Sequence, residues 1–149
     1  GKKTREREAR NPEAEAQAAM YTTSDGAPAI PLLAIKSAII SAAHKDIGIE
    51  KTLVRKALFI KADDESMNIA IDASDPVIRE DCVRVGQGSA DLRYRPQFGQ
   101  WAASITIEYD AELLNPTDIV NVVNRAGFGV GIGEWRPEKG GEFGRFRVA

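Results

Sequence analysis

The sequence has little cysteine and little histidine. Cys82 is the only cysteine among 149 residues, so no internal disulfide can form. His44 is the only histidine, and this pair of residues cannot supply the ligands of a Cys/His metal site. These scarcities exclude the disulfide-stabilised and zinc-binding classes of protein, and they suit a reducing, cytoplasmic setting. We expect no metal and no cofactor.

Long apolar runs are missing as well. No stretch approaches the roughly 20 consecutive apolar residues that a membrane-spanning helix requires, so we expect no membrane contact. The length predicts one domain with a single core. The chain starts with Gly1 rather than Met, and no apolar signal segment follows. We interpret this start as a trimmed chain or as the ordered part of a longer one.

A strong excess of either charge is absent, but the charge is unevenly distributed. The net charge is −2, which argues against a strongly basic nucleic-acid-binding protein. Residues 1–10 carry +3 and residues 125–149 carry +2, so residues 11–124 carry −7. Because charges act over a Debye length of about 8 Å, a local basic groove on an acidic protein remains compatible with phosphate binding.

Glycine, by contrast, is concentrated in one stretch. Seven of the thirteen glycines lie in residues 126–145, AGFGVGIGEWRPEKGGEFGR, which we name the glycine-rich segment. Glycines gather where a backbone needs positive φ or close approach by another molecule. Aromatic and cationic residues alternate with them, as in loops that stack bases and contact phosphates. A tight helix-to-strand junction followed by a glycine-rich hairpin is the structural alternative. The interleaved residues are Phe128, Trp135, Arg136, Lys139, Phe143 and Arg145.

The N-terminal residues are rich in charge and alanine. Asn11 followed by Pro12 is typical of a helix start, so we predict a short helix over residues 12–19. The mixed charge of residues 1–10 favours a mobile, solvated arm, and a nucleic-acid-binding tail is the alternative. We therefore divide the chain into an N-terminal arm, residues 1–19, and a single domain, residues 20–149.

The first strong helical pattern follows Pro31. Before it, the turn-forming residues 24–26 predict a small hairpin over residues 20–30. After it, apolar residues recur at helical spacing until Gly48 ends the pattern. Lys36 lies in the first turns of this helix, where it is either solvated or in contact with a phosphate near the helix N-terminus.

His44 lies near the end of the same helix. It is the only residue suited to general acid–base catalysis at neutral pH. A helix C-terminus also suits an imidazole for structural reasons, and no second catalytic candidate with suitable spacing accompanies it. The structural interpretation is therefore favoured over the catalytic one.

A β-rich region follows a shorter helix that we predict over residues 50–58. Alternation along residues 91–96 puts Arg93 and Arg95 on one face of a strand. Two arginines on one face can hold phosphates, and cross-strand pairing with carboxylates is the alternative. The predicted strands cover residues 59–61, 68–72, 77–85, 91–96 and 101–110, with a turn over residues 87–89.

A second clear helix begins at Asn115 and Pro116. We expect it to end at Gly127 as a left-handed cap, with a closing strand over residues 144–148 after the glycine-rich segment. The order of elements predicts an α+β fold of ferredoxin-like type: an antiparallel sheet with two main helices on one face and a glycine-rich loop before the last strand. The strand that should precede the first helix is supplied by residues 20–30 or lies upstream of Gly1.

Several stretches resemble known proteins. IPLLAIKSA, residues 30–38, is similar to the segment of the repeat-associated (RAMP) superfamily of CRISPR proteins in which a helix follows an Ile-Pro step. Residues 127–145 resemble the superfamily's C-terminal glycine-rich loop and strand. VRVGQGSADLRYRPQF, a WxxxxxxEYD strand and GFGVGIGEWRPEKGGEFGRF look like a family of small, mostly uncharacterised bacteriophage proteins. The resemblance covers residues 20–149, although the phage proteins carry an additional N-terminal strand that this chain lacks.

The resemblance implies an RNA-recognition-like module that binds single-stranded RNA without catalysis and assembles into a row of subunits. RNA is thus favoured over DNA as the partner, within a homo-oligomer or a larger ribonucleoprotein, and a phage protein of this kind acts in the host cytoplasm. The candidate nucleic-acid-binding residues are Lys36, Arg93, Arg95, Gly129, Gly131, Gly133, Trp135, Arg136, Lys139 and Arg145.

Two further functions remain open. The first is an endoribonuclease of the CRISPR-processing type, in which His44 would be the catalytic residue. The second is a phage interaction or inhibitor protein whose glycine-rich segment engages a host defence complex. Binding of oligonucleotides separates the nucleic-acid-binding functions from the second alternative, and its salt dependence counts the phosphates that are contacted.

Overall fold

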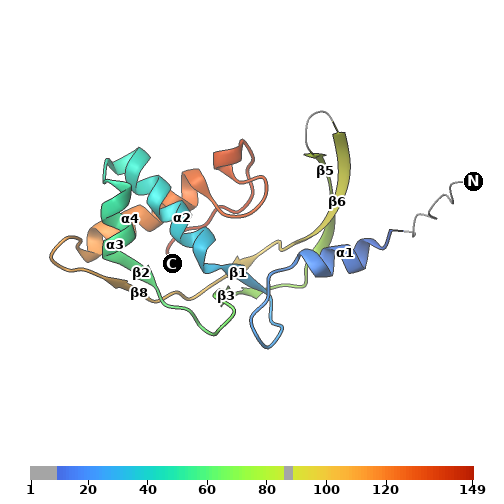
Figure 1. Ribbon diagram of the computed structural model, residues 1–149, viewed down its shortest axis with the longest axis horizontal. Helices are drawn as coiled ribbons and strands as arrows, with labels where there is room; N and C mark the ends of the chain where they lie inside the picture. Colours follow the sequence, from blue (N-terminus) through green and yellow to red (C-terminus); the bar gives the residue numbers. More distant parts are fainter. Residues whose placement is uncertain (1–9, 86–88) are drawn as a thin grey trace, which may run out of the picture.

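The protein combines α-helices with short antiparallel strand pairs, in a computed structural model that describes residues 10–85 and 89–149. Figure 1 shows helices α2, α3 and α4 gathered at one end of the molecule, and a long β-hairpin with helix α1 beside it at the other. This is the α+β class that the sequence predicts. Of the predicted mobile arm, residues 1–9 lie outside the described residues.

Helix α1, Pro12–Ala19, has the predicted bounds. The side-chain oxygen of Asn11 accepts a hydrogen bond from the Ala14 backbone N–H at 3.2 Å, and Pro12 lies in the first turn, where its missing N–H is not needed. The helix packs along strand β6, Ser89–Gln97, and buries Ala16. The N-terminal arm is therefore docked from Arg10 onward.

The predicted hairpin over residues 20–30 is confirmed. Thr22 and Pro28 form a β-bridge around its turn, and strand β1, Ala29–Pro31, leads directly into helix α2, Leu32–Ala42. A π-helical turn η1, Ala43–Ile47, extends α2 to Gly48. Gly48 has φ of +76°, so the predicted end of this helix is also confirmed.

Short antiparallel strand pairs lie beneath the helices in Figure 1. Helix α3, Lys51–Ala57, leads directly into strand β2, Leu58–Ile60. This strand begins one residue earlier than predicted. The pairs are β1 with β3 (Asn68–Ala70), β4 (Asp72–Ala73) with β7 (Trp101–Ala102), and β2 (Leu58–Ile60) with β8 (Ile107–Tyr109).

The strand predicted over residues 101–110 is interrupted. Its first part, β7, pairs with β4, whereas its last part, β8, pairs with β2. Because the two ends pair with different segments, residues 103–106 form no ladder between them. Alternating burial nevertheless continues from Trp101 to Glu108, as in a strand with one buried face, although the predicted strand is not continuous.

The long hairpin pairs strand β5, Val77–Val85, with β6. The bounds of β5 are as predicted, and the register runs from Val77 opposite Gln97 to Val85 opposite Ser89. Of the predicted turn, Gln87 and Gly88 lie outside the described residues, and Ser89 is the first residue of β6. Arg79 lies opposite Arg95, so two arginines share one face at the base of the hairpin.

Helix α4, Pro116–Arg125, begins as predicted, because the side chain of Asn115 accepts a hydrogen bond from the Asp118 backbone N–H at 2.8 Å. Its predicted end is wrong. Gly127 lies inside a second π-helical turn, η2, Ala126–Val130, which ends at Gly131 with φ of +74°. The predicted closing strand is also absent, since residues 144–148 form no strand.

One hydrophobic core joins helices α2, α3 and α4 to strands β2 and β3. Ile39 of α2, Leu58 of β2 and Ile69 of β3 are its largest fully buried side chains. Val122 of α4 and Val130 of η2 belong to the same cluster. The glycine-rich segment therefore starts inside the core and then leaves it.

Candidate nucleic-acid interface

The glycine-rich segment folds back on itself. After η2 the chain runs outward to a 3-10 turn, η3, Pro137–Lys139, and returns beside its outgoing part. Backbone hydrogen bonds join Phe143 N to Trp135 O at 3.1 Å, Ile132 N to Gly144 O at 3.1 Å, and Phe146 N to Gly127 O at 3.0 Å. The ring of Phe146 packs edge-to-face on Trp101, with ring centroids 6.1 Å apart. These contacts replace the predicted closing strand.

Most glycines of this segment are required by close contacts or by positive φ angles within the folded chain. A Cβ at Gly127 would lie 2.0 Å from the Phe146 carbonyl oxygen, one at Gly141 would lie 1.8 Å from that of Trp135, and one at Gly144 would lie 1.8 Å from that of Ile132. Gly127 is thus required for close packing and not for a left-handed cap. The glycines with positive φ are Gly131, Gly133, Gly140 and Gly144.

Gly129 is the exception among the seven. Its φ lies outside the positive region, and an added Cβ would meet no atom within 4 Å. It is exposed, and it lies within the helical turn η2, where glycine is less favourable than alanine by about 1 kcal/mol. No contact within the described residues explains it.

Trp135 is held in a strained and exposed position. Its φ is +56°, a region that bulky residues rarely adopt, and its side chain is 43% exposed. The backbone contact with Gly141 and the hydrogen bond from Phe143 N fix its carbonyl group. An indole on a fixed backbone presents a flat apolar face to solvent, which is what base stacking requires.

Arg136 and Lys139 lie beside Trp135 in the same fold-back. One Arg136 nitrogen donates to the Gly133 carbonyl at 3.1 Å, and another lies 3.5 Å from a Glu138 carboxylate oxygen. Glu138 also accepts a hydrogen bond from the Ser41 hydroxyl at 2.8 Å, which lowers the pKa of this carboxyl below its ordinary value. Glu138 therefore fastens η3 to helix α2, while Lys139 is exposed.

The base of the hairpin touches the glycine-rich segment through charged groups. Asp81, 8% exposed, lies 3.0 Å from Arg79 Nε and 3.4 Å from Arg95 Nη1. Arg95 also lies 3.3 Å from Glu134, and the Arg79 guanidinium lies 4.8 Å from the centre of the Phe143 ring. The predicted residue Arg95 thus contacts Glu134, which directly precedes Trp135. The charge of Arg95 is paired with the carboxylates of Asp81 and Glu134.

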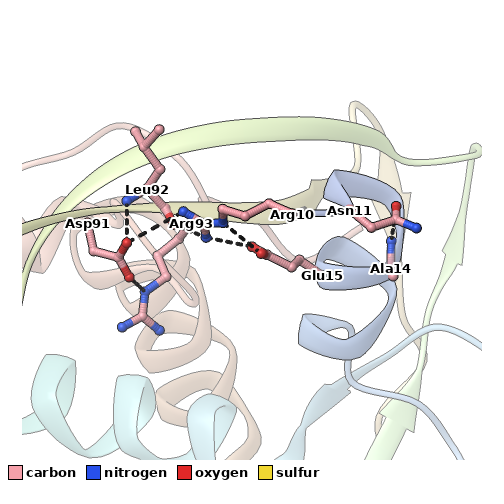
Figure 2. A network of polar contacts seen from close by, with 7 residues as sticks. All are labelled: Arg10, Asn11, Ala14, Glu15, Asp91, Leu92 and Arg93. Carbon is pink, nitrogen blue, oxygen red and sulfur yellow. Dashed lines mark hydrogen bonds and ion pairs between the residues drawn. The ribbon is translucent and has the colours of Figure 1, made fainter. Parts of the chain in front are cut away.

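Arg93 belongs to a different contact, between the hairpin and α1. Its Nε lies 3.3 Å from Asp91, and Arg10 approaches the same carboxylate at 3.5 Å (Figure 2). Arg10 also pairs with Glu15 at 2.8 Å and places its guanidinium 5.2 Å from the centre of the Tyr94 ring. The hydrogen bond from Arg10 lowers the pKa of the Glu15 carboxyl. Arg93 remains about half exposed.

Lys36 lies apart from the glycine-rich segment. Its ammonium group lies 4.3 Å from the centre of the Phe59 ring and donates to the Arg55 carbonyl at 3.3 Å. These partners belong to β2 and α3. Within the described residues, the contacts of Lys36 do not extend to the other predicted site residues.

His44 is exposed on the π-helical turn η1. This position, at the C-terminal end of the helix that begins after Pro31, is the one predicted from the sequence.

The remaining predicted residue, Arg145, lies on the returning part of the segment. Its guanidinium is 4.7 Å from the centre of the Phe128 ring. Phe128 is 67% exposed and borders an open groove of about 690 Å³ between η1 and the end of α4. The predicted residues therefore separate into four places: the fold-back with Arg95, the groove beside Arg145, the position of Arg93 on the hairpin, and the position of Lys36 beside Phe59.

Sequence reasoning left several contact residues unassigned. Arg79 and Asp81 alternate along a predicted strand with the same periodicity as Arg93 and Arg95, so pairing the two strands in register would have put them together. No local pattern predicts Glu134 as a partner of Arg95, because the two residues meet only in the folded chain.

Across residues 10–85 and 89–149, no group of three or more His, Cys, Asp or Glu residues could hold a metal ion. No helix in this part of the chain combines the length and apolar character needed to cross a bilayer. No protein-family model, curated protein or solved structure matches this chain.

Proposed function

We propose that this protein binds single-stranded nucleic acid, RNA in preference to DNA, and does not catalyse a reaction on it. The observation that carries the proposal is Trp135, an indole exposed on a strained and fixed backbone. Strain of this kind collects at functional sites, since a bulky residue at positive φ costs roughly 1–3 kcal/mol. A fixed aromatic plane loses little entropy when it stacks on a base.

The surroundings of Trp135 support the same ligand. Arg136 and Lys139 lie on the same fold-back, and both are within a few residues of the indole along the chain. Cations beside an aromatic plane bind the phosphates of a strand whose base stacks on that plane. Arg95 supports the site indirectly in this proposal, because its pairing with Glu134 holds the residue that precedes Trp135.

A relation to the RAMP superfamily and to small phage proteins is part of the proposal. It is supported by the short strand β1 directly before the Pro31-led helix α2, and by the glycine-rich segment directly after α4. A ferredoxin-like arrangement of the strands, assembly into rows, and membership of a ribonucleoprotein belong to the same proposal. They follow from the resemblance of the sequence.

The test is the affinity of Trp135→Ala for labelled single-stranded oligonucleotides, measured by fluorescence anisotropy. One stacked base contributes about 1–3 kcal/mol, so we expect binding about 5- to 150-fold weaker than that of the unaltered protein. Trp135→Phe keeps a stacking plane and should lose less affinity. RNA, DNA and a duplex of the same sequence are compared, because the 2′-hydroxyl distinguishes the first two.

Four results would count against the proposal. Equal affinity of Trp135→Ala and the unaltered protein would remove Trp135 from the site. Preference for the duplex would contradict single-strand binding. Absence of any oligonucleotide binding would favour an interaction protein, and loss of RNA cleavage in His44→Ala would favour the endoribonuclease.

A further inference from the structure

A groove separate from Trp135 lies between the two π-helical turns. Its lining residues come from η1, from the last turn of α4 and from η2. π-helical turns inside helices are rare and occur frequently at functional sites. The lining residues are Asp46, Ile47, Asn121, Asn124, Arg125 and Phe128.

Phe128 gives this groove an aromatic wall. The ring is 67% exposed although it follows the buried residues Ala126 and Gly127. The Arg145 guanidinium lies 4.7 Å from its centre, a distance at which cation and ring attract each other. The ring is therefore oriented by Arg145 and remains accessible, as a stacking surface must be.

Gly129 adds an independent observation. The other six glycines of the segment have positive φ or close backbone contacts, but Gly129 has neither. Alanine would fit there without a clash and would favour the helical turn. A missing side chain next to an exposed ring is useful when another molecule approaches the backbone at that point.

The polar groups of the groove suit the edge of a base. Asn121 is exposed and lines the groove. The Asn124 side-chain oxygen accepts from Val148 N at 2.8 Å, which leaves its amide N–H groups for another acceptor. The Asp46 carboxylate can accept from an exocyclic amino group, and Arg125 can contact a phosphate.

We propose that this groove holds one nucleobase, stacked on Phe128 and passing close to the backbone of Gly129. The biological context rests on the proposed function, since the base would belong to the same strand that stacks on Trp135. The chemistry of the groove also admits a free nucleotide, so the base is the shared ligand and the two sources are distinguished by experiment.

The first experiment titrates the protein with AMP and with UMP and follows backbone and side-chain amide signals by NMR. We expect shifts at Gly129 and at the Asn121 side chain, and none there with ribose 5-phosphate, which lacks the base. Phe128→Ala should remove these shifts, whereas Phe128→Tyr should keep them. Asn121→Ala, an exposed substitution that leaves the core intact, should weaken them as well.

The second experiment uses Gly129→Ala, for which folding and binding should change in opposite directions. We expect an unchanged or higher melting temperature, because alanine favours the helical turn, together with weaker binding of nucleotide and oligonucleotide. Phe128→Ala should weaken oligonucleotide binding about 5- to 150-fold.

The outcomes separate this inference from the proposed function. If oligonucleotides bind and depend on Trp135, but Gly129 and Asn121 never respond, the groove is not a base site and the proposed function stands. If the mononucleotides shift Gly129 and Asn121 while no oligonucleotide binds, the groove holds a free nucleotide and the proposed function fails. A Gly129→Ala protein that binds as well as the unaltered one overturns the inference.

Discussion

At the scale of single residues, the glycines of residues 126–145 are not interchangeable. Gly141 lies against the Trp135 carbonyl, Gly131 supplies a positive φ that ends η2, and Gly129 lies in open space. Glycine is required at position 141 by the neighbouring backbone and at position 131 by its own positive φ. Neither requirement applies at position 129. Substitution should therefore have a different effect at each of these positions.

Gly141→Ala should destabilise the protein and weaken oligonucleotide binding. The new Cβ would lie 1.8 Å from the Trp135 carbonyl oxygen, so one side of the fold-back must move. We expect a loss of roughly 1–3 kcal/mol in the free energy of unfolding, as for other overpacked sites, measured in urea. Gly99→Ala is the matched control, because an added Cβ there meets no atom within 4 Å. Equal stability of the two variants would mean that the fold-back is not formed in solution.

The sequence predicts that residues 126–145 need glycine, but it does not show which glycine meets which requirement. The partner of Gly127 is the carbonyl of Phe146, on the other side of the fold-back. Likewise, the exposed Trp135 could be proposed as a stacking residue from its type alone, whereas its positive φ follows from contacts with Gly141 and Phe143. Contacts of this kind leave no pattern in local periodicity.

At the scale of elements, the hairpin contacts the glycine-rich segment through Arg79 and Arg95, and the hairpin's own Asp81 lies between these two arginines. Asp81→Asn would leave Arg79 and Arg95 facing each other with reduced compensation. We expect a loss of roughly 1.5–3 kcal/mol in the free energy of unfolding, the usual contribution of hydrogen bonds to charged groups. This loss of stability should be accompanied by weaker oligonucleotide binding, since Arg95 would no longer hold Glu134 in place.

Asp91→Asn provides the comparison for this element. Asp91 is 47% exposed and faces Arg93 and Arg10, so solvent screens its pairs. Its substitution should change the free energy of unfolding by less than about 1 kcal/mol. A larger effect at Asp91 than at Asp81 would contradict the proposed role of Asp81 in holding Arg79 and Arg95.

Helix and strand boundaries could be predicted where the signal is local. Asn11 and Asn115 cap α1 and α4 through their own side chains, and both helices start as predicted. The end of α4 and the break in residues 101–110 depend on distant segments: Phe146 packs on Gly127, and β4 and β2 each take one end of the predicted strand. Tertiary contacts of this type override local propensity.

At the scale of the whole molecule, the surface proposed around Trp135 lies beside the base of the long hairpin. Under the proposed function, several copies should bind side by side on one oligonucleotide. Size-exclusion chromatography with light scattering should show one protein per short oligonucleotide and a discrete larger species with a longer one. Trp135→Ala should reduce the amount of that species. A protein whose mass is the same with and without long oligonucleotides would contradict row formation.

The contact between α1 and the hairpin has a consequence for local unfolding. Arg10 and Asp91 are far apart in the sequence and largely exposed, and α1 buries little beyond Ala16. Loop-closure entropy grows with separation, while exposed ion pairs return little free energy. We therefore expect helix α1 to behave as a low-stability unit that detaches before the core opens. Its detachment would uncover the Tyr94 ring and the Leu92 carbonyl, which Arg10 contacts in the docked form.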